Sequence, residues 1–131
     1  MSMVVDASAV LALLLDDGPT GRWVGQTCAG QHLVAPHLLP VEVVNVLRRR
    51  VLAGALSADA AALAHADLLA LPVGLVPYDP CAARVWELRA NLSACDGWYV
   101  ATAEAFDAPL TTLDLRLANA PGSRCTFLTS P

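Results

Sequence analysis

The chain has 131 residues and a net charge of −4, and arginine supplies all eight of its strongly basic side chains. Hydrophobic residues make up 56% of it, but Asp16, Asp17 and Asp67 interrupt the most apolar stretches, so no run approaches the roughly 20 residues that cross a bilayer. We expect one domain over residues 1–131, soluble and cytoplasmic, with no signal peptide because no lysine or arginine precedes the first apolar segment. An acidic chain is a poor bulk binder of polyanions, so a nucleic-acid ligand would need local arginines and bound cations.

Short stretches of β-prone residues alternate with helical patterns along the chain. We predict five strands, over residues 3–5, 32–36, 73–77, 108–112 and 125–128. Helices are predicted between them, over residues 7–15, 20–29, 37–53, 58–71, 80–91, 95–106 and 115–120, with caps at Thr20 and Ser57. This alternation favours a three-layer α/β/α fold, in which a parallel sheet of about five short strands is covered by helices on both faces.

Two aspartates directly follow predicted strands. Asp6 lies between the strand 3–5 and the helix 7–15, and Asp114 comes just after the strand 108–112. The carboxyl edge of an open α/β sheet is where ligands bind. Aspartate is also a favoured N-cap, so either residue could serve only to begin a helix. Two acids at the same edge nevertheless favour a functional pair.

Two further acids lie within predicted helices. Glu42 shares a stripe of the helix 37–53 with Asn45 and Arg49, and a polar stripe among valines and leucines faces either solvent or a cleft. The sequence leaves these two possibilities open. Asp96 begins the helix 95–106 above an apolar stripe that includes Tyr99. It could be a helix cap, but an acid at the head of a buried stripe favours a cleft.

The other acids and the tryptophans receive structural assignments. Turns are assigned to Asp16, Asp17 and Asp107, helix starts to Asp59 and Asp79, and solvated helix faces to Asp67, Glu87 and Glu104. Aromatic rings can stack on unpaired bases, but core packing is the stronger prediction for Trp23, Trp86 and Trp98.

The absence of lysine bears directly on the chemistry. P-loop proteins, receiver domains and haloacid-dehalogenase-like phosphatases all use a site lysine, and the last of these also need an acid where this chain has Ser8. Carboxylates that converge without a lysine raise one another's pKa, and a divalent cation is the natural way to neutralise them. All-oxygen sites suit Mg²⁺ or Mn²⁺, which can activate water for attack on phosphorus. The acids therefore predict phosphodiester hydrolysis.

Four segments that contain these acids match the pattern of a known family. They read VVDASA over residues 4–9, EVVNVL over 42–47, DGWYVATA over 96–103 and LTTLDLRLA over 110–118. In this order and at these spacings they resemble the PIN-domain ribonucleases, specifically the VapC-type toxins of bacterial toxin–antitoxin (VapBC) pairs. The resemblance covers nearly the whole chain. It implies the PIN-domain version of the predicted α/β/α fold and a Mg²⁺- or Mn²⁺-dependent endoribonuclease.

The same resemblance implies roles for individual residues. The catalytic and metal-binding quartet would be Asp6, Glu42, Asp96 and Asp114, with Asp6 and Asp96 as direct ligands and the other two acting directly or through water. Residues that match positions lining the site are Ser8, Thr112 and Asn45. Gly97 replaces the more usual alanine, which weakens the start of that helix slightly but removes no functional group.

Arginines and partners complete the expectations. Arg49 is the best placed of the run Arg48–Arg50 to grip RNA, and Arg116 is its rival because it follows Asp114 by two residues. The family pattern implies a homodimer, an RNA substrate (tRNA, rRNA or mRNA) and a VapB-type antitoxin whose basic segment enters the acidic site. Two alternatives stay open, namely a catalytically weak module that mainly binds its antitoxin and a metal phosphatase for small molecules.

Overall fold

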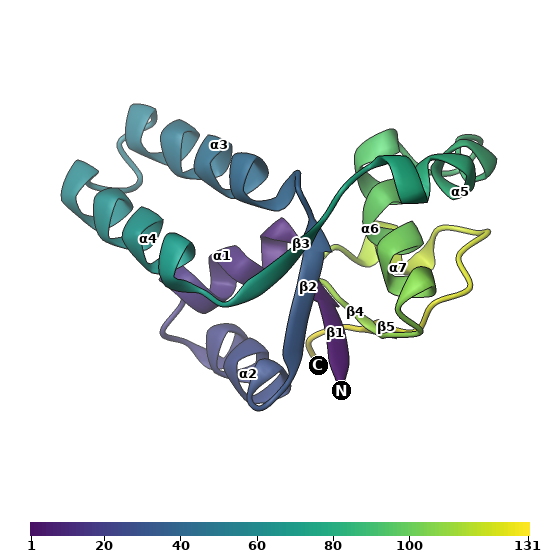
Figure 1. Ribbon diagram of the computed structural model, residues 1–131. Coiled ribbons are helices and arrows are strands. Elements are labelled where there is room, and N and C mark those ends of the chain that lie inside the picture. The colour runs from purple at the N-terminus through teal and green to yellow at the C-terminus, as the bar shows by residue number, and fades with distance from the viewer.

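The computed structural model describes all 131 residues and has a central sheet with helices on either side (Figure 1). The strands are β1 (Ser2–Val5), β2 (His32–Pro36), β3 (Val73–Val76), β4 (Leu110–Thr111) and β5 (Phe127–Leu128). The helices are α1 (Ala7–Leu15), α2 (Pro19–Cys28), α3 (Leu39–Leu52), α4 (Ala58–Ala70), α5 (Ala82–Glu87), α6 (Ala94–Ala105) and α7 (Leu115–Asn119). A single 3-10 turn, η1 (Asp79–Cys81), precedes α5.

All neighbouring strands of the sheet run parallel, in the order β3-β2-β1-β4-β5. Val4 of β1 pairs with Val34 on one side and with Leu110 on the other. The chain builds outward from β1 to β3 and then returns to β4 on the opposite side of β1. The strand order therefore reverses between β1 and β4, and ligands of open α/β sheets bind beyond the carboxyl ends of the strands at such a point.

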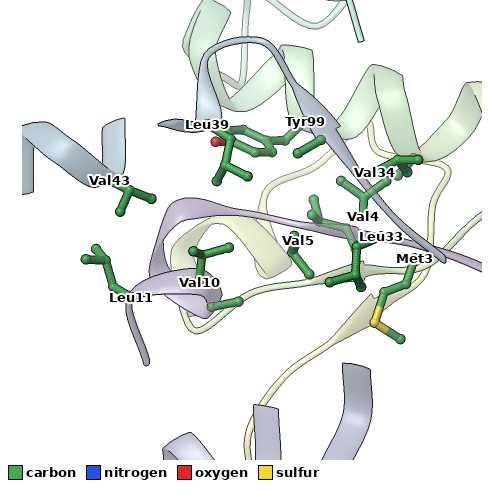
Figure 2. Packing of buried hydrophobic residues seen from close by; sticks show 14 of the residues in the cluster. Met3, Val4, Val5, Val10, Leu11, Leu33, Val34, Leu39, Val43 and Tyr99 are labelled. Carbon is green, nitrogen blue, oxygen red and sulfur yellow. The ribbon is translucent and has the colours of Figure 1, made fainter. Parts of the chain in front are cut away.

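Helices cover both faces of the sheet, which confirms the predicted three layers. Figure 1 shows α1 to α4 on one side of the sheet and α5 to α7 on the other. The central strand β1 buries Met3, Val4 and Val5 in succession, as a strand covered on both faces must. Figure 2 shows these residues together with Val10 of α1 and Leu39 of α3, which belong to the same core cluster. This packing holds the carboxyl end of β1 rigidly against its neighbours.

Most of the predicted elements are confirmed, and two predictions are wrong. α1 and β2 have the predicted bounds, and the Ser57 hydroxyl caps α4 as expected. The single helix predicted over 80–91 is wrong, because η1 leads into a short α5 and the chain turns after Glu87. Thr20 is not a cap, because α2 already begins with Pro19, whose missing N–H costs nothing at the first helical position. None of the helices has the length and hydropathy that crossing a bilayer requires.

Glu104 does not lie on a solvated helix face as predicted. Its Oε1 accepts a hydrogen bond from Nε of Arg84 at 2.6 Å, and its Oε2 accepts one from the backbone N–H of Arg124 at 2.8 Å. This carboxylate therefore joins α5 and α6 to the C-terminal loop. The partners come from distant parts of the chain, which is why helical periodicity did not indicate them.

The tryptophans differ from one another in their surroundings. Trp23 and Trp98 pack against core clusters, in agreement with the prediction. Trp86 is 67% exposed, so its predicted core position is wrong, and the guanidinium of Arg89 lies 4.4 Å from the centroid of its ring. Val85 occupies the buried side of this short helix instead.

The two helices α1 and α2 approach each other closely at Gly21. A Cβ atom at this position would lie 1.8 Å from the carbonyl oxygen of Asp16 and 3.0 Å from that of Ala12. Both neighbours are backbone atoms and cannot move aside as a side chain can. A residue without a side chain is therefore required here for α2 to pack on the end of α1.

Candidate active site

Asp6 lies at the junction of β1 and α1 and is 6% exposed. Its Oδ1 accepts hydrogen bonds from the backbone N–H of Ala9 at 3.0 Å and from the hydroxyl of Ser8 at 2.6 Å. Its Oδ2 accepts a hydrogen bond from the hydroxyl of Thr112. Asp6 is thus an N-cap, but two side-chain hydroxyls also converge on it, which capping alone does not need.

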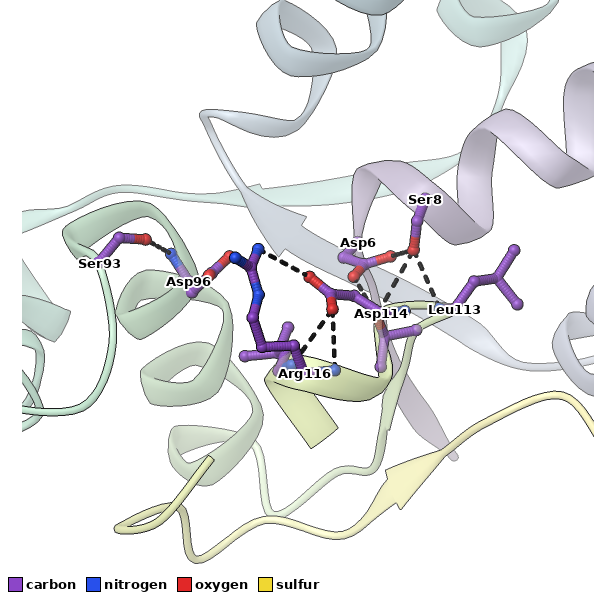
Figure 3. Close-up of polar contacts among 9 residues, drawn as sticks. Asp6, Ser8, Ser93, Asp96, Leu113, Asp114 and Arg116 are labelled. Carbon is purple, nitrogen blue, oxygen red and sulfur yellow. Dashed lines mark hydrogen bonds and ion pairs between the residues drawn. The ribbon is translucent and has the colours of Figure 1, made fainter. Parts of the chain in front are cut away.

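The two hydroxyls connect the loops that follow β1 and β4. Ser8 Oγ accepts from the backbone N–H of Leu113 at 3.0 Å, and Thr112 Oγ1 accepts from that of Asp114 at 3.0 Å. Each hydroxyl thus accepts a hydrogen bond from a backbone N–H of the loop after β4 and donates its own proton to the carboxylate of Asp6. Figure 3 shows this network around Asp6, Ser8 and Leu113. It fixes both oxygens of the Asp6 carboxylate at the switch point of the sheet.

Asp114 caps α7 and faces an arginine. Its Oδ1 accepts from the backbone N–H groups of Arg116 at 3.0 Å and Leu117 at 3.3 Å. Its Oδ2 lies 3.7 Å from Nη2 of Arg116, whose side chain is 89% exposed. Figure 3 shows the guanidinium reaching toward Asp96, and its positive charge counteracts the rise in the pKa of that acid. The charge of Arg116 therefore acts on two of the four acids, Asp114 and Asp96.

Asp96 lies in the first turn of α6 but is not its cap. The cap is Ser93, whose hydroxyl accepts from the backbone N–H of Asp96 at 3.1 Å. The carboxylate of Asp96 consequently has no capping role. Burial raises its pKa, and the charge of Asp114 raises it further. The structure thus rules out the helix cap for Asp96 and places this acid beside Asp114 and Glu42.

Glu42 is half-buried and faces α6. Its Oε1 accepts a hydrogen bond of 2.7 Å from the hydroxyl of Tyr99. Burial raises the pKa of Glu42, and the charges of Asp96 and Asp6 raise it further against the opposing effect of this hydrogen bond. Glu42 therefore turns toward α6 and the other acids, whereas Asn45 and Arg49 of the same stripe are exposed. Tyr99 was not identified as a site residue from the sequence, although its position three residues after Asp96 puts it on the same helix face.

The four acids lie in one electrostatic neighbourhood. Burial raises the pKa of Asp6, and its hydrogen bonds partly offset this rise. The charge of Asp114 raises the pKa of both Asp6 and Asp96. Asp6 and Asp96 in turn both act on Glu42. Four separate elements thus bring the quartet of predicted acids together at the carboxyl edge of the sheet.

The donor set suits a hard divalent cation. Four carboxylates and two hydroxyls supply only oxygen ligands, as Mg²⁺ and Mn²⁺ prefer, and the raised pKa values reflect buried negative charge with little compensation. As the side chains stand, no three of the histidine, cysteine, aspartate and glutamate residues converge closely enough to hold one ion. Carboxylates that repel one another are expected to close around a cation only once it is present.

The other predicted lining residues are less central. A groove of about 600 Å³ between α1 and α3 is lined by Ser8, Leu113 and Arg50. Arg50 is thus the arginine of α3 that lines this groove, and the role of Arg49 stays a prediction. Asn45 is exposed and lines a different, shallower groove, with no hydrogen bond to the acids. Nothing in the local sequence distinguishes Arg50 from its neighbours.

Comparison with known proteins agrees with this geometry. A family model described as PIN domain matches residues 3–123. Ribonuclease VapC9 of Mycobacterium tuberculosis is 40% identical over 129 residues, 98% of each chain, and Ribonuclease VapC1 of that organism is 40% identical over 123 residues, 93% of this chain and 92% of that one. The solved structure of VapBC2 from Rickettsia felis, bound to a promoter DNA fragment, superposes with a TM-score of 0.70 at 10% identity and 98% coverage of both chains. The chain therefore belongs to the PIN-domain family and, within it, to the VapC ribonucleases.

Proposed function

We propose that this protein is the toxin of a VapBC pair and an endoribonuclease that depends on Mg²⁺ or Mn²⁺. The observation that carries the proposal is the gathering of Asp6, Glu42, Asp96 and Asp114 at the switch point of the sheet, three of them with a raised pKa. Such perturbed acids in a cleft are typical of catalytic sites. The names of the relatives, which are ribonucleases at 40% identity, support the same reaction.

In this proposal the chain holds the cation with its carboxylates. Asp6 and Asp96 bind it directly, and Glu42 and Asp114 bind it directly or through water. The bound cation would activate a water molecule for attack on the phosphodiester and stabilise the leaving oxygen. Ser8 and Thr112 keep Asp6 in one orientation by donating to both of its oxygens.

The proposal assigns the arginines to the substrate. Arg116 is 89% exposed beside Asp114, so its guanidinium can turn from the acids to a phosphate of the RNA. Arg50 lies in the groove that leads away from Ser8 and can bind a neighbouring phosphate. Arg49 lies in the same turn of α3, and we assign it to phosphates farther along the RNA.

Cleavage of RNA by an isosteric variant tests the reaction. Wild-type protein and Asp6→Asn are incubated with labelled RNA and Mn²⁺, alongside Asp59→Asn, which removes an exposed acid from the start of α4. We expect cleavage by the wild type and by Asp59→Asn but not by Asp6→Asn. Equal cleavage by all three proteins would point to a contaminating nuclease and refute the proposal, whereas turnover of mononucleotides alone would indicate a phosphatase.

We further propose that a VapB-type antitoxin inhibits the toxin through a basic segment and that the toxin is a homodimer. The groove of about 600 Å³ leads from Ser8 to Asp16 and Asp17, and its lining combines apolar side chains with these two acids and one arginine, Arg50, so a basic segment would meet a net negative charge there. Light scattering of the protein alone and after co-expression with a VapB-type antitoxin measures both assemblies. The double variant Asp16→Asn/Asp17→Asn should bind that partner more weakly.

A catalytically weak module that acts mainly by binding its antitoxin is the second candidate. The observation in its favour is that no three carboxylates converge closely enough to hold an ion as they stand. Calorimetric titration of the wild type with Mn²⁺ separates the two functions. Binding favours the nuclease, and an absence of binding at millimolar Mn²⁺ favours the module.

A further inference from the structure

Tyr99 is the residue of the site whose part in the proposed reaction is still unassigned. It is 2% exposed, with its ring in the main core cluster, and Figure 2 shows the ring next to Leu39. Its hydroxyl leaves the core and donates to Oε1 of Glu42 at 2.7 Å. We infer that Tyr99 is a positioning residue that holds Glu42 in the orientation required for cation binding. This inference rests on the proposed function.

The geometry gives this hydrogen bond a specific consequence. Glu42 has three rotatable side-chain bonds and no other hydrogen-bond partner for its carboxylate in the protein. With Oε1 held by Tyr99, Oε2 is left as the oxygen that can turn to a cation. Residues that orient a metal ligand from behind in this way typically change metal affinity by roughly 10- to 100-fold when they are removed.

The hydrogen bond also connects the two helices that face each other across the site. No other hydrogen bond joins α3 to α6. Asp96 lies one turn before Tyr99 on α6, so a single helix face carries both a proposed ligand and the donor that orients another. Through Tyr99, the carboxylate of Glu42 is therefore tied directly to the helix that carries Asp96.

A purely structural role is the alternative, because a buried tyrosine hydroxyl normally needs an acceptor. The variant Tyr99→Phe removes only the hydroxyl and keeps the buried ring, so the fold is retained. Thr102→Val is the matched control. Thr102 lies on the same helix and is completely buried, and its hydroxyl donates to the backbone oxygen of Trp98 and lies 3.9 Å from Sγ of Cys81, with no contact to the acids.

Calorimetric titration with Mn²⁺, without RNA, measures the effect. We expect Tyr99→Phe to bind Mn²⁺ at least about tenfold more weakly than the wild type and Thr102→Val to bind it equally well. Because the hydroxyl acts through Glu42, adding Tyr99→Phe to Glu42→Gln should produce little further loss. In RNA cleavage, Tyr99→Phe should raise the Mn²⁺ concentration for half-maximal rate, and saturating Mn²⁺ should restore most of the rate.

The outcomes separate this inference from the proposed function. Equal Mn²⁺ affinity of Tyr99→Phe and the wild type would overturn the inference and leave the nuclease proposal standing. Additive losses from Tyr99→Phe and Glu42→Gln would overturn it as well, because the hydroxyl would then act elsewhere. Wild-type protein that binds no Mn²⁺ would refute both.

Discussion

The packing of α2 on α1 makes a quantitative prediction about two glycines of the same helix. In the variant Gly21→Ala, the new Cβ would lie 1.8 Å from the carbonyl oxygen of Asp16, whereas real Cβ contacts are rarely shorter than 3.4 Å. The two backbones would have to separate by the difference, 3.4 − 1.8 = 1.6 Å. In Gly25→Ala, the nearest atom would be Cδ1 of Leu13 at 3.8 Å, an ordinary contact.

The two substitutions should therefore change stability in opposite directions. Alanine is favoured over glycine in a helix by about 1 kcal/mol, and this gain applies to both positions. Overpacking costs about 1–3 kcal/mol when side chains can adjust, and at Gly21 the obstacle is backbone. The shift would also loosen Val24, which is fully buried on α2. We expect Gly21→Ala to lose about 2 kcal/mol or more, and Gly25→Ala to gain up to about 1 kcal/mol.

Urea denaturation followed by far-UV circular dichroism measures both changes. The midpoint of Gly21→Ala should fall and that of Gly25→Ala should rise, with similar slopes if the unfolded states are alike. A Gly21→Ala variant that is as stable as the wild type would show that α1 and α2 are not in close contact at this glycine, and the packing argument would fail.

Two further predictions concern the site. The variant Thr112→Val removes a hydroxyl that donates to the buried Asp6, so it should abolish most RNA cleavage and destabilise the protein by about 1–3 kcal/mol. The variant Thr111→Val removes a buried hydroxyl that has no hydrogen-bond partner, so it should be neutral or stabilising. Equal effects of the two variants would contradict this. Burial raises the pKa values of Asp6, Glu42 and Asp96 in the folded protein. These three acids therefore contribute their full stability below about pH 4, near the pKa values of the unfolded chain, and this contribution is lost as the pH rises through the folded-state pKa values. Thermal melts of Asp96→Asn should thus lose less stability than the wild type between about pH 4 and pH 7, and Mn²⁺ should raise the melting temperature of the wild type more at pH 7 than at pH 5. A parallel pH dependence of the two proteins would refute the assignment of Asp96.

Local chemistry explains what could be predicted from the sequence. The bounds of α1 and β2, the cap at Ser57 and the parallel order of strands and helices all follow from interactions within a few residues or from the period of the apolar positions. The positions of Asp6 and Asp114 at the carboxyl edge follow in the same way, because Asp6 comes directly after β1 and Asp114 lies in the short connection between β4 and α7.

What remained open required contacts between distant segments. Glu42 turns toward α6 and the other acids because Tyr99, 57 residues away in sequence, donates to it. Arg50 lines the groove beside Ser8 because α1 and α3 pack against each other there, which no local signal encodes. The sequence by itself thus determined which elements form and which acids lie at the sheet edge, since these depend on short-range propensity. Only the tertiary structure decided where the long side chains point and which glycine must stay a glycine, since these depend on which elements meet in space.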